Sequence, residues 1–102
     1  MNTQMVYNAP VGITVGTTST ALVVATGSRK LLVLTNDSDA VIYLGIGSAA
    51  VLNKGMRLEI PSSANKGSVL QFGGENGLPL TTQAVNAISV AGSKVVLVQE
   101  AF

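Results

Sequence analysis

The sequence contains no cysteine, no histidine and no tryptophan. Without cysteine there is neither a disulfide framework nor a thiolate metal site. Without histidine the commonest general base at neutral pH is missing, and a Ser-His-Asp or Cys-His triad is impossible. With two tyrosines and two phenylalanines as the only aromatic residues, the flat platforms on which sugars usually stack are scarce. These absences make an enzyme the least favoured class of function.

Charged residues are also scarce. They make up 11% of the 102 residues, whereas 47% are hydrophobic; an ordinary soluble domain carries about 25% charged residues. A chain of this length forms one domain and buries only about 60–65% of its unfolded surface. Because few charges are available to cover the remainder, we expect part of the apolar surface to be hidden against another chain. The alternative is a surface rich in Ser, Thr, Asn and Gly.

Membrane and nucleic-acid partners are not expected. No apolar run approaches the roughly 18–20 residues that span a bilayer. The first ten residues, MNTQMVYNAP, lack the basic start and apolar core of a secretory signal. The net charge is +1, the six Lys and Arg residues are scattered along the chain, and the four aromatic residues form no stacking cluster.

The stretch that organises the chain is residues 29–47, RKLLVLTNDSDAVIYLGIG. Its two apolar runs, residues 30–35 and 40–46, are separated by the polar cluster Asn-Asp-Ser-Asp at 36–39, and this pattern predicts a β-hairpin. Both faces of each run are apolar, so we expect both to be covered, the second by another subunit. A helix is the competing interpretation of short apolar runs, but the β-branched residues and closely spaced turns favour strands.

Other apolar runs, bounded by Gly, Pro, Asn and Ser, predict further strands. They lie at residues 11–15, 20–26, 56–60, 69–72, 84–91 and 94–99. Residues 78–82 contain Pro79, which suits an edge strand or a loop. Seven to nine short strands without a convincing helix predict an all-β fold, a small β-sandwich of jelly-roll or Greek-key type or a small barrel, over residues 11–102.

Residues 1–10 are polar and have no clear periodicity, and we interpret them as an extended N-terminal arm. We expect Met5, Val6 and Tyr7 to anchor this arm on a neighbouring subunit; a frayed terminus is the alternative. Phe102, at the other end of the sequence, is expected to tuck into an apolar site. These four residues are the candidate partner contacts.

No motif in the chain predicts a catalytic, cofactor-binding or metal-binding residue. Asp37 and Asp39 have the D-x-D spacing of oxygen ligands for calcium, but the rest of an EF-hand loop is missing and a plain turn is favoured. Two carboxylates can hydrolyse a glycosidic bond, yet sugar-stacking aromatics are sparse. The Gly45-Ile46-Gly47 run lacks the lysine of a phosphate-binding loop and suits a strand bend. A catalytic pair of serine and lysine is also not indicated, because nothing in the sequence places a lysine beside a particular serine.

The order of these features is similar to that of a known group of proteins. An apolar strand opens with Ser-Arg-Lys at 28–30, a polar turn follows at 36–39, Ile-Tyr-Leu-Gly stands at 42–45, an alternating strand ends at Pro61, and KVVLVQE closes the chain at 94–100. In this the sequence resembles small virion proteins of tailed bacteriophages, most of all head decoration, or cement, proteins.

The resemblance implies a β-sandwich or jelly roll on the capsid exterior, present as trimers or dimers that brace neighbouring capsomers. We therefore expect a structural virion protein that cements a capsid across subunit junctions, is assembled in the host cytoplasm and uses no cofactor. Its expected partners are the major capsid protein and further copies of itself, with a trimer favoured over a dimer. The alternative is a receptor- or carbohydrate-binding module of a phage tail or fibre.

Overall fold

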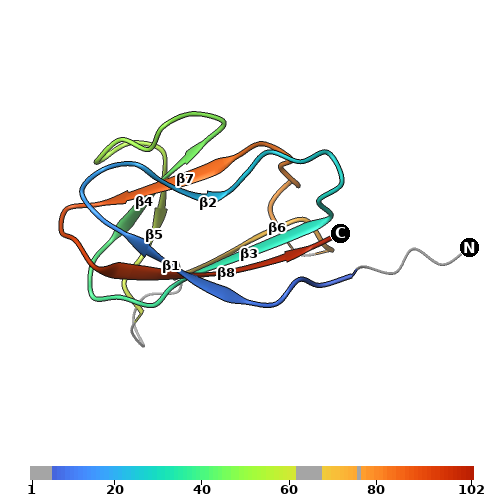
Figure 1. Ribbon diagram of the computed structural model, residues 1–102, viewed down its shortest axis with the longest axis horizontal. Helices are drawn as coiled ribbons and strands as arrows, with labels where there is room; N and C mark the ends of the chain where they lie inside the picture. Colours follow the sequence, from blue (N-terminus) through green and yellow to red (C-terminus); the bar gives the residue numbers. More distant parts are fainter. Residues whose placement is uncertain (1–5, 62–67, 76) are drawn as a thin grey trace, which may run out of the picture.

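The computed structural model describes residues 6–61, 68–75 and 77–102, and within these ranges it contains strands and no helix. The strands are β1 (Val11–Val15), β2 (Thr20–Val23), β3 (Leu31–Asn36), β4 (Ile42–Ile46), β5 (Met56–Leu58), β6 (Val69–Phe72), β7 (Val85–Ser89) and β8 (Lys94–Ala101) (Figure 1). This confirms the predicted all-β class. It also places the apolar runs of the sequence in strands.

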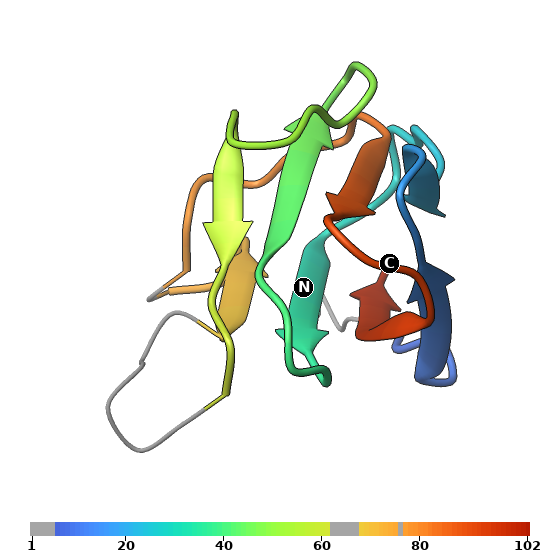
Figure 2. The same ribbon diagram turned by 90° about the vertical axis from the view of Figure 1, so that its left-hand side faces the viewer.

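The strands form two four-stranded sheets that pack face to face. We call the sheet with strand order β1-β8-β3-β6 sheet A and the sheet with order β2-β7-β4-β5 sheet B. Figure 2 shows the strands of sheet B in the upper part of the molecule and those of sheet A in the lower part. The architecture is therefore the expected small β-sandwich.

All strand pairs are antiparallel, and they are nested in sequence. Strand β4 pairs with β5, β3 with β6, β2 with β7 and β1 with β8. The outer pairs enclose the inner ones, as if one long hairpin had been rolled up, so that β8 lies between β1 and β3 and β7 lies between β2 and β4. This nesting of Greek keys is the jelly-roll arrangement.

The two inner sheet faces make one hydrophobic core. Alternation along each strand sends every second side chain inward. The fully or nearly buried members are Val15, Leu22, Val23, Leu32, Leu34, Ile42, Leu44, Leu58, Phe72, Val85, Ala87, Val96 and Val98. The strand with the cleanest alternation, β5, buries Leu58 completely and leaves Arg57 exposed, as its sequence predicts.

The predicted hairpin between residues 30–35 and 40–46 is wrong. Strand β3 belongs to sheet A and β4 to sheet B, so the turn between them crosses the sandwich. The cause is Asn36, whose side chain is fully buried. Its amide nitrogen donates to the carbonyls of Ala40, Leu58 and Glu59, at 2.8, 3.1 and 3.1 Å, and its amide oxygen accepts from Ser38 Oγ at 2.6 Å. These bonds hold the crossing turn against the start of the next connection.

A second buried polar residue closes the opposite end of the sandwich. The guanidinium group of Arg29 is fully buried. It donates from Nε to Glu100 Oε2 at 2.8 Å, and from its other nitrogens to the carbonyls of Thr81, Gln83 and Val24 at 3.0, 3.0 and 2.5 Å. The fork of Arg29 thus ties the start of β3 to the end of β8 and to the two connections, β2–β3 and β6–β7, that run between the sheets.

The apolar outer side of β3 is covered in part by the chain itself. Leu31 is buried although its neighbour Leu32 fills the core on the other side. The turn at Gly73 and Gly74 lies over it: a Cβ added at Gly74 would be 3.6 Å from Leu31 Cδ1. At this end of β3 the second cover is therefore the connection after β6 rather than another subunit.

Candidate interaction surface

The feature of the molecule best suited to contact a partner is the solvent side of sheet A, which we call the outer face. Cross-strand neighbours share a face, so the register defines its members. One row runs across all four strands through Gly12, Leu97, Thr35 and Val69. The outer face comprises Gly12, Thr14, Leu31, Val33, Thr35, Val69, Gln71, Val95, Leu97, Gln99 and Ala101. None of these residues is charged.

The outer face is partly apolar and exposed. Val69 retains 48% of its exposure and Leu97 retains 40%. Beside Leu97 lies a hollow of about 180 Å³, lined by Pro10, Val33, Thr35, Leu97, Val98 and Gln99. Exposed apolar side chains next to neutral polar ones are the composition of the centre of a protein–protein interface, from which charged residues are depleted.

The charged residues of sheet A lie on its other side. Lys94 is opposite Val15 and Glu100 is opposite Leu32, both core residues, so both charges belong to the inner face. Lys94 pairs with Asp39 at one end of the sandwich and Glu100 with Arg29 at the other. Binding of a partner to the outer face would therefore not remove water from any charged side chain of sheet A. Removal of water from charged side chains is the step with the largest free-energy cost when polar surface is buried.

The solvent side of sheet B differs. It carries Arg57, which pairs with Glu59 at 3.1 Å, and Tyr43, whose hydroxyl donates to Asn53 Oδ1 at 3.0 Å. The connection formed by residues 47–55 folds over this side and is fastened by a 2.7 Å hydrogen bond from Asn86 Nδ2 to the Ser48 carbonyl. Sheet B is thus covered by its own chain where sheet A is open.

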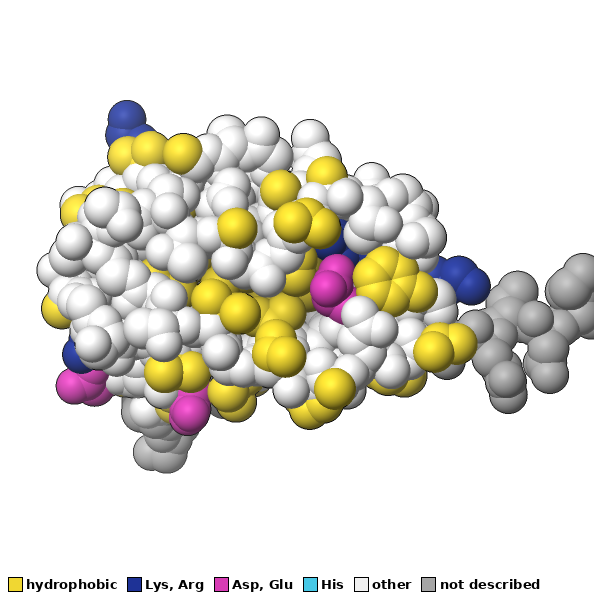
Figure 3. Space-filling model, in the orientation of Figure 1, with side chains coloured by type: hydrophobic (Ala, Val, Ile, Leu, Met, Phe, Trp, Pro, Cys, Tyr) yellow, Lys and Arg dark blue, Asp and Glu magenta, His cyan; other side chains and the backbone are white. Residues whose placement is uncertain are grey.

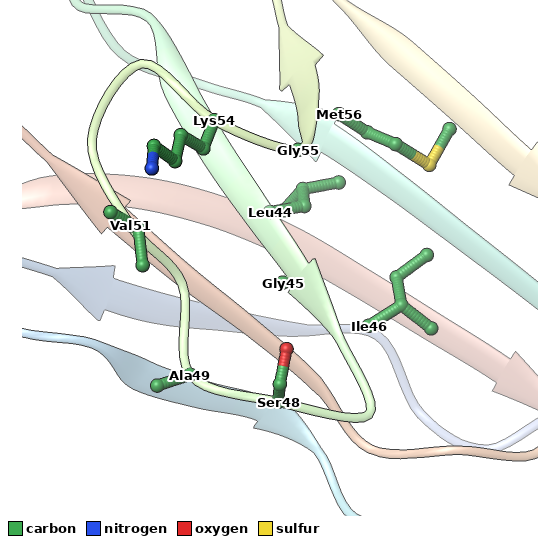
Figure 4. A pocket seen from close by; sticks show the side chains of 9 residues that line it. All are labelled: Leu44, Gly45, Ile46, Ser48, Ala49, Val51, Lys54, Gly55 and Met56. Carbon is green, nitrogen blue, oxygen red and sulfur yellow. The ribbon is translucent and has the colours of Figure 1, made fainter.

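That same connection encloses a pocket of about 360 Å³ (Figure 4). It is lined by Leu44, Gly45, Ile46, Ser48, Ala49, Val51, Lys54, Gly55 and Met56. A Cβ added at Gly45 would lie 2.7 Å from the carbonyl oxygens of Ser48 and Ala49, so only glycine permits this fold-back. Lys54 is the one charged lining residue, and the lining includes neither a carboxylate nor an aromatic ring. The predicted bend at 45–47 turns at Gly47, where φ is 75°.

Three of the four predicted contact residues lie together. Val6 and Phe102 exchange backbone hydrogen bonds of 2.7 and 2.8 Å, and Asn8 N–H donates to the Glu100 carbonyl at 2.9 Å. Tyr7 sits between them, opposite Ala101. Val6 and Tyr7 are 67% and 56% exposed, whereas Phe102 is half-buried. The fourth, Met5, lies outside the described residues.

The edge of the sandwich above this arm is apolar as well. Figure 3 shows hydrophobic side chains gathered between the two sheets, over the edge formed by β1 and β2. Val11 on β1 is 49% exposed and Val24, just after β2, is 72% exposed. This edge therefore carries exposed apolar surface of its own, beside β1.

The two aspartates of the polar turn are both bonded to residues of β8. Asp39 Oδ1 accepts from Lys94 Nζ at 2.5 Å, and the backbone N–H of Asp37 donates to the Val95 carbonyl at 3.0 Å. Over the described ranges, no group of three or more carboxylates is arranged to hold a metal ion. The favoured interpretation of these residues, a plain turn, agrees with this geometry.

The Lys94–Asp39 pair makes the free energy of unfolding depend on pH. The hydrogen bond and charge of Lys94 hold the pKa of the Asp39 carboxyl below its ordinary value of 3.8. The unfolded chain therefore binds this proton more readily than the folded one, so the contribution is complete above pH 3.8 and is lost as pH falls through the lowered pKa. We expect Asp39→Asn to be less stable than wild type at neutral pH and equal to it in strong acid. Urea denaturation at several pH values measures this, and a difference that does not change with pH would contradict it.

No protein-family model, curated protein or solved structure matches this chain. Among the residues described, no helix is long and apolar enough to cross a membrane. The likeness to phage virion proteins therefore remains one of sequence pattern. Beyond it, only the surfaces of the molecule bear on its function.

Proposed function

We propose that this chain is a structural virion protein that decorates or cements a phage capsid by binding across junctions between capsid subunits. The observation that supports this proposal is the outer face, a neutral and partly apolar sheet surface next to an exposed arm and an apolar edge. The jelly roll is a fold of viral capsid and lectin domains. That likeness is an analogy at the level of the fold, and it adds weight without assigning a function.

The mechanism is thermodynamic. A protein that binds the assembled shell and not its separated subunits stabilises the shell by mass action, by about 2.7 kcal/mol when its free concentration is a hundred times its dissociation constant. The outer face supplies apolar area for such a contact. The arm and the edge strand β1 supply backbone groups that can pair with a further strand. The partners are the major capsid protein and further copies of this chain, with a trimer favoured over a dimer.

The proposal is tested by two measurements on the purified chain. Light scattering across a dilution series is expected to give the mass of a trimer or a dimer. Capsid shells of the same phage, mixed with the chain and sedimented, are expected to bind it at saturable, regular stoichiometry and to dissociate at a higher temperature. A monomer at every concentration that does not sediment with shells would overturn the proposal.

Removal of residues 1–8 is expected to weaken binding to shells or to other copies without unfolding the domain. The deletion takes away three backbone hydrogen bonds at the end of β8, each worth about 1 kcal/mol net, and leaves the core strands in place. Circular dichroism should show an intact β-sheet protein, while sedimentation shows reduced binding. Unchanged binding by the shortened chain would show that the arm is not a contact.

One observation favours a second function, a receptor- or carbohydrate-binding module. The pocket under residues 47–55 has the size of a small-ligand site and a single lysine at its wall. Its lack of an aromatic ring is unfavourable for a sugar. A glycan array separates the two functions: selective binding that is lost in Lys54→Ala, together with a monomeric mass, would support the module.

A further inference from the structure

The end of β8 requires a neighbouring strand, and the arm supplies it. The backbone groups of Glu100 and Phe102 accept from Asn8 and Val6, and Phe102 N–H donates back to Val6. Ala101 between them has no exposed surface. If the arm were absent, these edge groups and the side of Ala101 would face solvent. The end of sheet A is therefore completed by a segment far away in sequence.

The arm is joined to β1 by a connection that allows residues 6–8 of the arm to move together as one unit. Ala9 and Pro10 are exposed and make no hydrogen bond within the described ranges. Tyr7 is opposite Ala101 and Val11 is opposite Val98, so four steps along the arm match three along β8. The ladder is thus interrupted between arm and β1, where Pro10 has no N–H to donate. The arm and β1 are two separate additions to β8.

We propose that the arm is exchanged between copies of this chain, so that residues 6–8 of one copy pair with residues 100–102 of its neighbour. This inference rests on the proposed function, because it requires that copies associate. The exchanged arm makes the same backbone bonds as the unexchanged one, so exchange replaces no contact and demands only that a second copy be near, as in domain swapping.

The position of Tyr7 points to the neighbour that receives the arm. Because Tyr7 is the cross-strand partner of Ala101, its ring belongs to the outer face, where the next row contains Val33 and the row after that contains Leu97. In the single chain this ring is 56% exposed. A second copy seated on the outer face would cover it, so the surface that brings copies together also lies next to the arm.

Cysteine pairing tests the exchange, and the natural chain has no cysteine to interfere. Tyr7 and Ala101 are flanked on both sides by hydrogen-bonded pairs, so their Cα atoms are about 4.5 Å apart, within the range of a disulfide. Purified Tyr7→Cys chain and Ala101→Cys chain are mixed and oxidised. We expect covalent dimers that contain one chain of each kind. The doubly substituted chain, oxidised at a concentration where it is oligomeric, is expected to give covalent oligomers on a denaturing gel.

The matched control is Tyr43→Cys with Arg57→Cys, neighbours on the hairpin β4–β5 of sheet B, which should yield disulfides within one chain only. If Ala101→Cys unfolds the chain because that site is buried, Val6→Cys with Phe102→Cys repeats the test at exposed and half-buried positions. Disulfides confined to single chains in an oligomeric protein would overturn the exchange and leave the proposed function standing. A protein that light scattering shows to be monomeric at every concentration would overturn the exchange, and it would overturn the proposed function as well only if it also failed to sediment with shells.

Discussion

Replacing Arg29 by alanine is expected to destabilise the fold by about 3 kcal/mol. Removal of one partner from a buried ion pair typically costs about 3–5 kcal/mol, and the lower end applies because Glu100 keeps 19% of its side-chain exposure. The substitution also leaves the carbonyls of Thr81, Gln83 and Val24 without their donor. Since small domains are stable by only about 5–15 kcal/mol, the variant should lose a large share of its stability.

Urea denaturation of three variants tests this expectation. Arg29→Lys keeps the charge but not the planar fork, so it should lose an intermediate amount. Arg57→Ala is the control: its side chain is 53% exposed, and loss of its pair with Glu59 should change stability by less than about 1 kcal/mol. If Arg29→Ala were no less stable than Arg57→Ala, the four bonds of the buried fork would not stabilise the fold.

Introducing a charge at the centre of the outer face, by Leu97→Glu, is expected to weaken self-association at least about a hundredfold. Leu97 lies in the row with Gly12, Thr35 and Val69, where no neighbour offers a positive charge. Burial of an unpaired carboxylate there would cost about 3 kcal/mol, which corresponds to a factor of about a hundred in the dissociation constant.

Light scattering across a dilution series measures this loss, and Val51→Glu is the matched control. Val51 is also an exposed apolar residue, at 51%, but it lies on the connection that covers sheet B. Both variants should stay close to wild-type stability in urea, because both residues are exposed in the single chain and neither belongs to the core. If Leu97→Glu associated like wild type, or if Val51→Glu dissociated equally, the outer face would not be the contact.

The strands of this fold were predictable from the sequence, and their division between sheets was not. Strands such as β1 and β6 match the predicted residues because short β-branched runs end at Gly, Asn and Ser, a local signal. The assignment of strands to the two sheets depends on pairings between residues far apart in the sequence: β3 pairs with β6 and β8, not with the next strand, β4. The polar cluster at 36–39 has the composition of a hairpin turn, and only burial of the Asn36 amide among three carbonyls makes it a crossing.

The candidate contacts were predictable in part. The apolar character of Val6, Tyr7 and Phe102 singled them out, but their meeting depends on a register that joins the two ends of the sequence. In the sequence Arg29 stands out only as part of the Ser-Arg-Lys run that opens a strand. Its partner Glu100 is 71 positions away, and no spacing rule connects them. The outer face is uncharged because the side chains of Lys94 and Glu100 belong to the inner face. That orientation can be assigned only when the pairing of the strands in the sheet is known.

The nested pairing sets the order in which the chain can fold. Strands β4 and β5 are joined by a short connection and can pair as soon as both exist, and β3 can likewise pair with β6, whereas β1 has no partner strand in its sheet until β8 exists. Proteins dominated by such distant pairings fold slowly, in milliseconds to seconds. On the ribosome, β1 therefore stays unpaired and β3 keeps one edge open until residues 94–101 have left the exit tunnel. Until then β1 and β3 present open edges, which is the period when a chaperone or a rapid release from the ribosome protects the chain from aggregation.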